Sequence, residues 1–194
     1  MGLILTVLAP ISFVNGLLLK VGRAIGIVAI AAMVVAILIQ VVARYVFNNA
    51  LPWPDEAARF AMLWMTGLMA PTAFRRGGFV ALDMISGVLP RSLAALLSLV
   101  LLLISITILI VALPIGYAEV TGFGGRFATA SLYLPTFDGW FRVPRSWMML
   151  SLLVGVALLT LVNIELILRE LVRIGGRGDD LPDLDIGDKM AGAE

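Results

Sequence analysis

Two groups of charged residues flank one predicted membrane helix, and their types and spacing could do chemistry. Guanidinium groups this close in sequence to carboxylates can form ion pairs, bind lipid head groups or contact a charged partner. Neither group pairs a nucleophile with a base, as covalent catalysis requires. The chemistry that they suggest is therefore electrostatic positioning. The first group is Arg44, Asp55 and Glu56, and the second is Arg75, Arg76 and Asp83.

Histidine and cysteine are both absent from the 194 residues. The chain therefore lacks the commonest general base and the commonest metal ligand, and it has no thiol nucleophile or disulfide. Its net charge of +1 gives no basis for nucleic-acid binding. We expect no catalytic, cofactor-binding or metal site, and a protein that is not an enzyme.

The composition is that of a membrane protein. Hydrophobic residues make up 61% of the chain and charged residues 14%, whereas a soluble domain has about a quarter charged residues. The charge-free runs are residues 24–43, 60–74, 92–118 and 146–164, and a span needs about 20 apolar residues. We predict an all-α membrane protein with four spans, at about residues 21–47, 54–74, 92–118 and 146–173. The runs do not alternate in polarity, so β-structure is not expected.

Two terminal segments flank this four-helix domain of residues 20–174. Residues 1–19 carry no charge but are interrupted by Pro10, Asn15 and Gly16. We interpret residues 1–19 as an N-terminal helix that lies in the membrane interface or leads into the first span; a fifth, distorted span is the alternative. Residues 175–194 are acidic and contain Gly and Pro, so we expect a disordered cytoplasmic tail.

Basic residues indicate the orientation, because they are more frequent in cytoplasmic loops. If the N-terminus is cytoplasmic, the inner side holds most of them, and both termini are then cytoplasmic. The inner set is Lys20, Arg23, Arg75, Arg76, Arg91, Arg169, Arg173, Arg177 and Lys189, and the outer set is Arg44, Arg59, Arg126, Arg142 and Arg145.

The outer corner between the first two spans is short, which makes these helices antiparallel neighbours. Pro54 suits the first turn of a helix, and Asp55 and Glu56 place negative charge at its positive end. Trp53 stands where interfacial aromatic residues belong. Arg44 is close enough to pair with either carboxylate across the corner. The corner either anchors the hairpin in the interface or contacts a partner.

On the inner side, Arg75 and Arg76 follow the second span, and Asp83 is within reach of either. They either fix the topology with a local ion pair or contact lipid head groups or a partner. Gln40 lies near the end of the first span, and an unpaired amide is costly in lipid. We therefore expect Gln40 to make a polar contact between helices.

The remaining polar and small residues in the spans have simple interpretations. Glu165 can pair with Arg169 one helical turn later. No second buried ionisable group is evident, which argues against a proton relay. Gly22 and Gly26 form a small-residue pair that permits close approach of another helix.

Several short blocks, taken in order, resemble the small membrane subunit of TRAP (tripartite ATP-independent periplasmic) transporters, the DctQ-like family. Phe79 stands where that family often has histidine. The order of the blocks within four spans is more specific than any one of them. The blocks are Gln40-Val41, Arg44-Tyr45-Val46-Phe47-Asn48, Leu51-Pro52-Trp53 with Asp55-Glu56, then Arg76, Gly78 and Asp83, and finally Pro144-Arg145-Ser146-Trp147.

The resemblance implies a non-catalytic subunit of the bacterial inner membrane, without a cofactor. In such transporters a large DctM-like membrane subunit carries the substrate and sodium sites and moves as an elevator. A periplasmic substrate-binding protein delivers the solute, often an organic acid. The small subunit packs against the large one and holds it in the membrane lipids.

Two other classes of function compete with this interpretation. A self-sufficient homo-oligomeric channel or carrier needs polar residues at mid-membrane. The spans supply few of these apart from Gln40, Thr66, Ser105, Thr107 and Thr160. A membrane enzyme needs a cluster of His, Cys, Asp or Glu on facing helices, and the sequence offers none.

Overall fold

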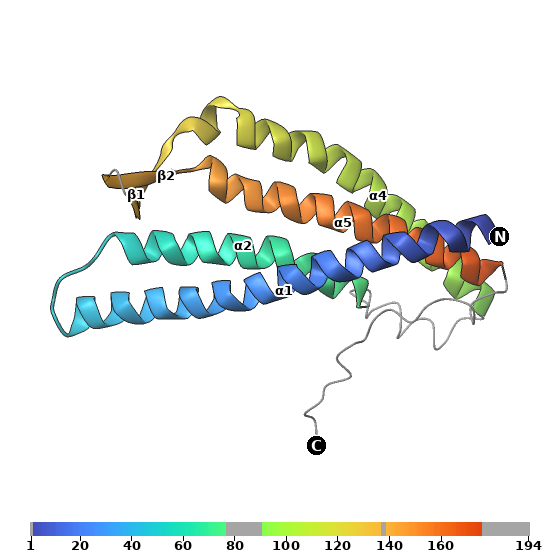
Figure 1. Ribbon diagram of the computed structural model, residues 1–194, viewed down its shortest axis with the longest axis horizontal. Helices are drawn as coiled ribbons and strands as arrows, with labels where there is room; N and C mark the ends of the chain where they lie inside the picture. Colours follow the sequence, from blue (N-terminus) through green and yellow to red (C-terminus); the bar gives the residue numbers. More distant parts are fainter. Residues whose placement is uncertain (1, 77–90, 137–138, 176–194) are drawn as a thin grey trace, which may run out of the picture.

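The computed structural model describes residues 2–76, 91–136 and 139–175. Within these residues, four long helices lie side by side as an elongated bundle (Figure 1). α2 packs between α1 and α5, and α4 packs on α5. The helices are α1 (Gly2–Tyr45), α2 (Trp53–Arg75), α4 (Arg91–Thr121) and α5 (Ser146–Ile174). Their helical character confirms the predicted class, and the last three agree with the predicted spans within three residues at each end.

α1 joins the predicted leading segment and the first span in one continuous helix. Pro10 lies inside it and removes one backbone hydrogen bond without ending it. The helix ends at a turn in which Asn48 has a φ of 48°, a left-handed conformation that Asn tolerates well. The Asn49 N–H donates to the Ala43 carbonyl at 3.0 Å.

α2 begins as the sequence predicts. Pro54 lies in its first turn, together with Asp55 and Glu56, and no side chain caps this end. Its last turn contains Arg75, whose positive charge is favourable at the negative end of a helix. The following N–H, of Arg76, donates to the Thr72 carbonyl at 3.2 Å and closes the helix.

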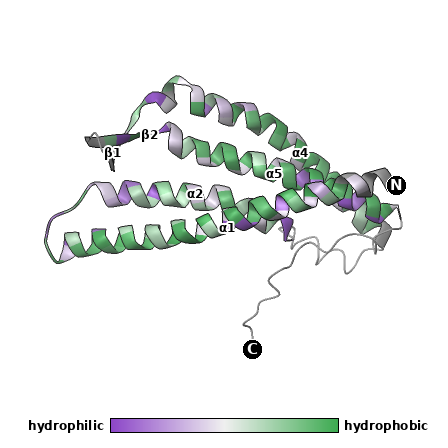
Figure 2. Ribbon diagram, in the orientation of Figure 1, coloured by the Kyte–Doolittle hydropathy of each residue, from purple (hydrophilic) through white to green (hydrophobic). Residues whose placement is uncertain are grey.

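Three of the described helices are long and apolar enough to cross a membrane: α1 from Leu8 to Tyr45, α4 from Leu93 to Thr121, and α5. Most of the ribbon of these three helices has the green of hydrophobic residues (Figure 2). α2 does not meet the same measure of length and composition. Residues 77–90, which include the predicted site residue Asp83, and the tail beyond residue 175 lie outside the described residues.

Glycines allow the closest helix contacts in the bundle. A Cβ atom on Gly67 of α2 would lie only 2.3 Å from the Ser151 carbonyl oxygen of α5, and one on Gly155 would lie 2.8 Å from the Gly67 Cα. α2 and α5 therefore touch through their backbones at this crossing. On the other side of α2, Gly22 and Gly26 of α1 pack against Leu68 and Met69, as their spacing predicted.

The outer connection between α4 and α5 contains an antiparallel ribbon. It comprises a short 3-10 helix, η1 (Phe123–Arg126), followed by β1 (Ala128–Thr136) and β2 (Gly139–Pro144). Tyr133 pairs with Arg142, and an irregularity separates this register from the pair at Ala128. The expectation of no β-structure was wrong here, because it was drawn from the long apolar runs and not from the connection between them.

Candidate functional site

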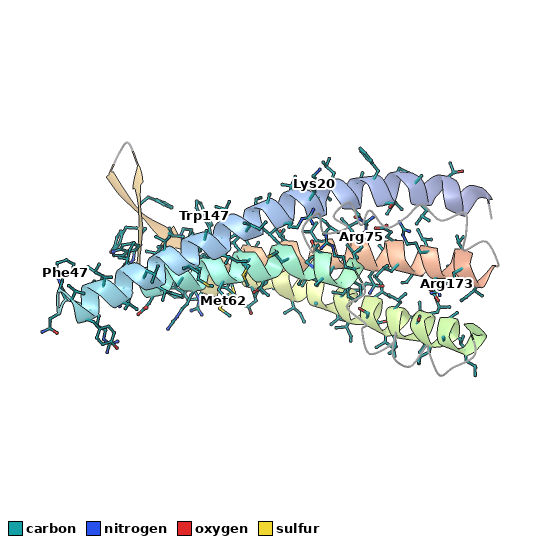
Figure 3. All side chains as sticks on the ribbon, turned by 90° about the horizontal axis from the view of Figure 1, so that it is seen from below. Lys20, Phe47, Met62, Arg75, Trp147 and Arg173 are labelled. Atoms are coloured by element: carbon teal, nitrogen blue, oxygen red, sulfur yellow. The ribbon has the colours of Figure 1, made fainter. Side chains whose placement is uncertain are left out.

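Five polar side chains from three helices meet in a buried group, which we name the three-helix cluster. Its centre is the carboxylate of Glu165, which is 0% exposed, while Arg75 and Arg169 are 8% and 7% exposed. α1 contributes Ser12 and Asn15, α2 contributes Arg75 at its end, and α5 contributes Glu165 and Arg169. Figure 3 places Arg75 between α1 and α5.

Both oxygens of the Glu165 carboxylate accept charge-assisted hydrogen bonds. Arg75 donates from Nη2 to Oε1 at 2.8 Å and from Nε to Oε2 at 3.1 Å, in the two-pronged geometry that suits a guanidinium. Arg169 Nε donates to Oε1 at 3.0 Å. Asn15 Nδ2 donates to Oε2 at 2.8 Å. This carboxylate is therefore saturated by donors from all three helices.

Ser12 links the two arginines on the α1 side. Its Oγ accepts from Arg75 Nη2 at 3.0 Å and from Arg169 Nη2 at 2.9 Å, and its carbonyl accepts from Arg75 at 3.2 Å. Asn15 also donates to the Leu161 carbonyl of α5 at 3.2 Å. The cluster thus ties together backbone and side chains that are remote in sequence.

Helical spacing explains how these residues come together. Ser12 and Asn15 are three residues apart on α1, and Glu165 and Arg169 are four apart on α5, so each pair lies on one helix face. Arg75 reaches both faces from the last turn of α2. Removing one member of a buried ion pair generally costs about 3–5 kcal/mol, because the remaining charge stays buried without compensation.

The arrangement is suited to holding helices, not to a reaction. The two oxygens of the Glu165 carboxylate accept hydrogen bonds from Arg75, Arg169 and Asn15. Among the described residues, no group of three or more His, Asp or Glu side chains is placed to hold a metal ion. What the cluster can do chemically is fix the relative positions of α1, α2 and α5.

The structure shows the surroundings of the charged residues that were predicted at the inner end. Arg75 pairs with Glu165, while Asp83, its predicted neighbour, lies outside the described residues. The pairing of Glu165 with Arg169 is confirmed at 3.0 Å. The expectation of no second buried ionisable group was wrong, since Arg75 and Arg169 are both buried. Arg76 is exposed.

At the outer corner the structure adds a contact that the sequence did not predict. Glu56 accepts hydrogen bonds from the backbone N–H of Ser131 and, at 2.6 Å, from its hydroxyl, so that it ties α2 to the ribbon. The Ser131 hydroxyl also contacts the Pro52 carbonyl at 2.9 Å. Arg44 lies 6.0 Å from the ring centre of Tyr45, and Asp55 is exposed.

Two other predicted site residues are Trp53, at the outer corner, and Gln40, in the first span. Trp53 is 39% exposed at the start of α2. Gln40 is half-buried on α1, and its side-chain oxygen has no hydrogen-bond partner within the described residues. Within the described residues, the side-chain oxygen of Gln40 therefore does not make the polar contact between helices that we predicted.

Sequence reasoning missed Ser12 and Asn15. Residues 1–19 were judged by their lack of charge, and the polar residues among them were treated as interruptions. The available signal was their spacing, since Ser12 and Asn15 share a face of an otherwise apolar helix. In a membrane protein such a face indicates a buried polar partner.

The fold and the three-helix cluster together define a multi-pass helical membrane protein with buried ion pairs between its helices. The family model for the DctQ component of tripartite ATP-independent periplasmic transporters matches residues 33–173. Because the match covers most of the chain, the protein belongs to the DctQ family, and the resemblance inferred from its motifs is confirmed. A comparison with curated proteins gave no significant match.

The residues that the family model matches include only part of the three-helix cluster. Arg75, Glu165 and Arg169 lie inside residues 33–173, whereas Ser12 and Asn15 precede them. The first part of α1 is thus joined to the family domain through buried polar contacts. These contacts make the segment part of the same packed unit.

Proposed function

We propose that this chain is the non-catalytic small subunit of a TRAP secondary transporter and acts as a scaffold for a large, DctM-like membrane subunit. Membership of the family makes it a component of such a transporter. The observation that carries the scaffold role is the saturated three-helix cluster. Its polar groups are directed at one another, which provides rigidity and leaves the Glu165 carboxylate without an open coordination position.

The transport chemistry in this proposal belongs to the partners. The large subunit binds the solute and sodium and moves against the small subunit, and a periplasmic binding protein delivers the solute, an organic acid. A moving subunit requires a fixed reference in the bilayer. Close helix contacts at glycines and the buried ion pairs of the three-helix cluster hold this bundle together, which suits that requirement.

The orientation and remaining sites follow from the same proposal. Like α1, α4 and α5, α2 crosses the membrane despite its charged ends, which makes four spans. Both termini face the cytoplasm. The outer corner, with Arg44, Trp53, Asp55 and Glu56, orients the hairpin or contacts a partner. At the inner end, Arg76 and Asp83 contact lipid head groups or the large subunit, while Arg75 serves the cluster.

Affinity purification from native membranes tests the proposal. Tagged protein is extracted in a mild detergent, and the co-purifying proteins are identified and quantified by mass spectrometry. We expect one large multi-span protein at equal stoichiometry. A homo-oligomer without such a partner would contradict the scaffold role and favour a self-sufficient channel or carrier.

A further inference from the structure

Basic side chains outnumber acidic ones in the connection between α4 and α5. Its described residues, 122–136 and 139–145, contain three arginines and no acidic residue. Glu56 of α2 also reaches this connection, where its carboxylate accepts a hydrogen bond from Ser131 at 2.6 Å. The surplus of positive charge is therefore local to the ribbon end of the bundle. The three arginines are Arg126, Arg142 and Arg145.

The backbone brings two of these arginines together. Gly125 allows η1 to fold back tightly on α4, because a Cβ atom there would lie 2.6 Å from the Val120 carbonyl oxygen. η1 ends at Arg126. The carbonyl of the next residue, Phe127, accepts a hydrogen bond from the Arg145 N–H at 2.8 Å. Arg126 therefore lies beside the start of α5, next to Arg145, at the ribbon end of the bundle (Figure 1).

The guanidinium groups of this pair are available to an external ligand. Arg126 and Arg145 are exposed, and the side chain of neither forms a hydrogen bond or ion pair with another of the described residues. Arg142 differs, since its Nε donates to the Thr129 carbonyl and its guanidinium lies 5.7 Å from the ring centre of Tyr133. Two neighbouring guanidinium groups suit an anion with several acceptor oxygens, and phosphate is the one that arginine recognises best.

The pair stands at a boundary of the apolar layer. The charge-free run 146–164 of α5 is about 28 Å long, close to the roughly 30 Å of a hydrocarbon core, and Arg145 directly precedes it. Trp147, in the first turn of α5, is 44% exposed, and its ring centre lies 6.1 Å from that of Phe141. Phe127 is 55% exposed. Exposed aromatic residues at the end of an apolar run are typical of the level of lipid head groups.

We propose that Arg126 and Arg145 bind the phosphate of one anionic phospholipid at the ribbon end of the bundle. A lipid with a net negative charge is preferred over a zwitterionic one, because the latter carries an ammonium group that the arginines repel. An acidic protein surface is the competing occupant, and the position of the pair directly beside an apolar run favours the lipid. This inference concerns the chain alone and does not depend on the proposed transporter partners.

Lipid titration followed by native mass spectrometry tests the proposal. The purified chain in a mild non-ionic detergent is titrated with phosphatidylglycerol or with phosphatidylcholine of identical acyl chains, and the bound lipids are counted. Phosphatidylglycerol should bind about tenfold more tightly at the first site, since each arginine near a head group contributes about 1 kcal/mol. Glycerophosphoglycerol, the same head group without acyl chains, should not displace it at equal concentration.

Paired substitutions assign the preference to these two residues. The double variant Arg126→Gln, Arg145→Gln should bind both lipids alike, at the level of phosphatidylcholine. The double variant Arg44→Gln, Arg59→Gln is the matched control, because it removes the same charge from two other exposed arginines, and it should keep the tenfold preference. Arg126→Lys with Arg145→Lys keeps the charge and should keep most of the preference. Circular dichroism verifies that every variant retains its helices.

Four results would overturn the proposal. Equal binding of the two lipids by the natural chain would leave an acidic protein surface as the partner of this pair. A preference that survives Arg126→Gln with Arg145→Gln would place the lipid elsewhere, and an equal loss in the Arg44 and Arg59 control would reduce it to overall charge. Displacement by glycerophosphoglycerol would indicate a site for a soluble phosphate compound instead of a lipid.

Discussion

The two ends of this bundle use charged residues in opposite ways. At one end Glu165 is completely buried, and its two oxygens are held by donors from α1, α2 and α5. At the other end Arg44 and Asp55 are exposed, and the link between elements is the contact of Glu56 with Ser131 on the ribbon. The charged residues at the cluster end therefore hold the helices together. Those at the outer corner, beside the ribbon, are exposed and available for contact with lipid or a partner.

The exposed aromatic residues support this division. Phe123 of η1, Phe127 beside it and Tyr133 of the ribbon are 78%, 55% and 47% exposed. Phe123 and Phe127 also pack edge to face, with ring centres 5.2 Å apart. Large exposed aromatic residues are typical of membrane interfaces and of protein contacts. Disturbing the cluster should accordingly affect folding, and disturbing the corner should affect assembly.

The largest effect is expected for Glu165→Gln. The neutral amide leaves Arg75 and Arg169 buried without a counter-charge, which should destabilise the bundle by about 3–5 kcal/mol. Thermal unfolding in detergent, followed by circular dichroism, measures the loss. Glu119→Gln is the matched control, because Glu119 is an exposed residue of α4. Equal melting temperatures for the two variants would contradict a stabilising role of the three-helix cluster.

A smaller loss is expected for Gly67→Ala. Its new Cβ would lie 2.3 Å from the Ser151 carbonyl oxygen, so α2 and α5 must separate, at a cost of about 1–3 kcal/mol. Gly16→Ala is the control, since the nearest atom to its Cβ is Arg75 Nη1 at an ordinary 3.7 Å. The same melting experiment should show a loss for residue 67 only. A similar loss in both variants would mean that helix crossing at Gly67 is not the cause.

A local effect is expected for Glu56→Gln. The substitution weakens the charge-assisted contacts of Glu56 with Ser131 by about 1–2 kcal/mol, which should loosen the ribbon and leave the helices intact. Hydrogen exchange by mass spectrometry should show faster exchange in residues 128–136, with an unchanged melting temperature. Asp55→Asn, at the exposed neighbouring position, should leave exchange unchanged. Slower or equal exchange after Glu56→Gln would exclude this anchoring.

The smallest effect on stability is expected for Arg44→Glu, because exposed charge contacts contribute about 0–1 kcal/mol. If the corner contacts a partner, this reversal should nevertheless reduce assembly or uptake more than Arg177→Glu does in the predicted tail. Co-purification yield and solute uptake in cells measure the difference. Equal effects at the two positions would leave Arg44 with no specific role in assembly.

The sequence was informative about the helices because membrane spans follow directly from charge-free runs. The predicted ends of α2, α4 and α5 agree with the structure since prolines and charged residues stand at those ends. The ribbon was missed because its residues lie in a connection of mixed composition. Its register depends on contacts such as the 2.7 Å hydrogen bond from Thr129 Oγ1 to the Val143 carbonyl.

The cluster could be predicted only in part. Glu165 and Arg169 are four residues apart, and helix geometry alone pairs them. Asn15 and Arg75 are separated from Glu165 by 150 and 90 positions, so their contacts require knowledge of how three helices pack. The glycine pair of α1 indicated a close contact but not its partner, because small residues permit approach without selecting which helix approaches.

Reconstituted transport tests the central claim most directly. Liposomes that contain the co-purified large subunit, supplied with the binding protein and a sodium gradient, are compared without this chain, with it, and with its Glu165→Gln variant. We expect little uptake without the chain, full uptake with it, and reduced uptake with the variant. Equal uptake in all three preparations would contradict a scaffold held rigid by the three-helix cluster.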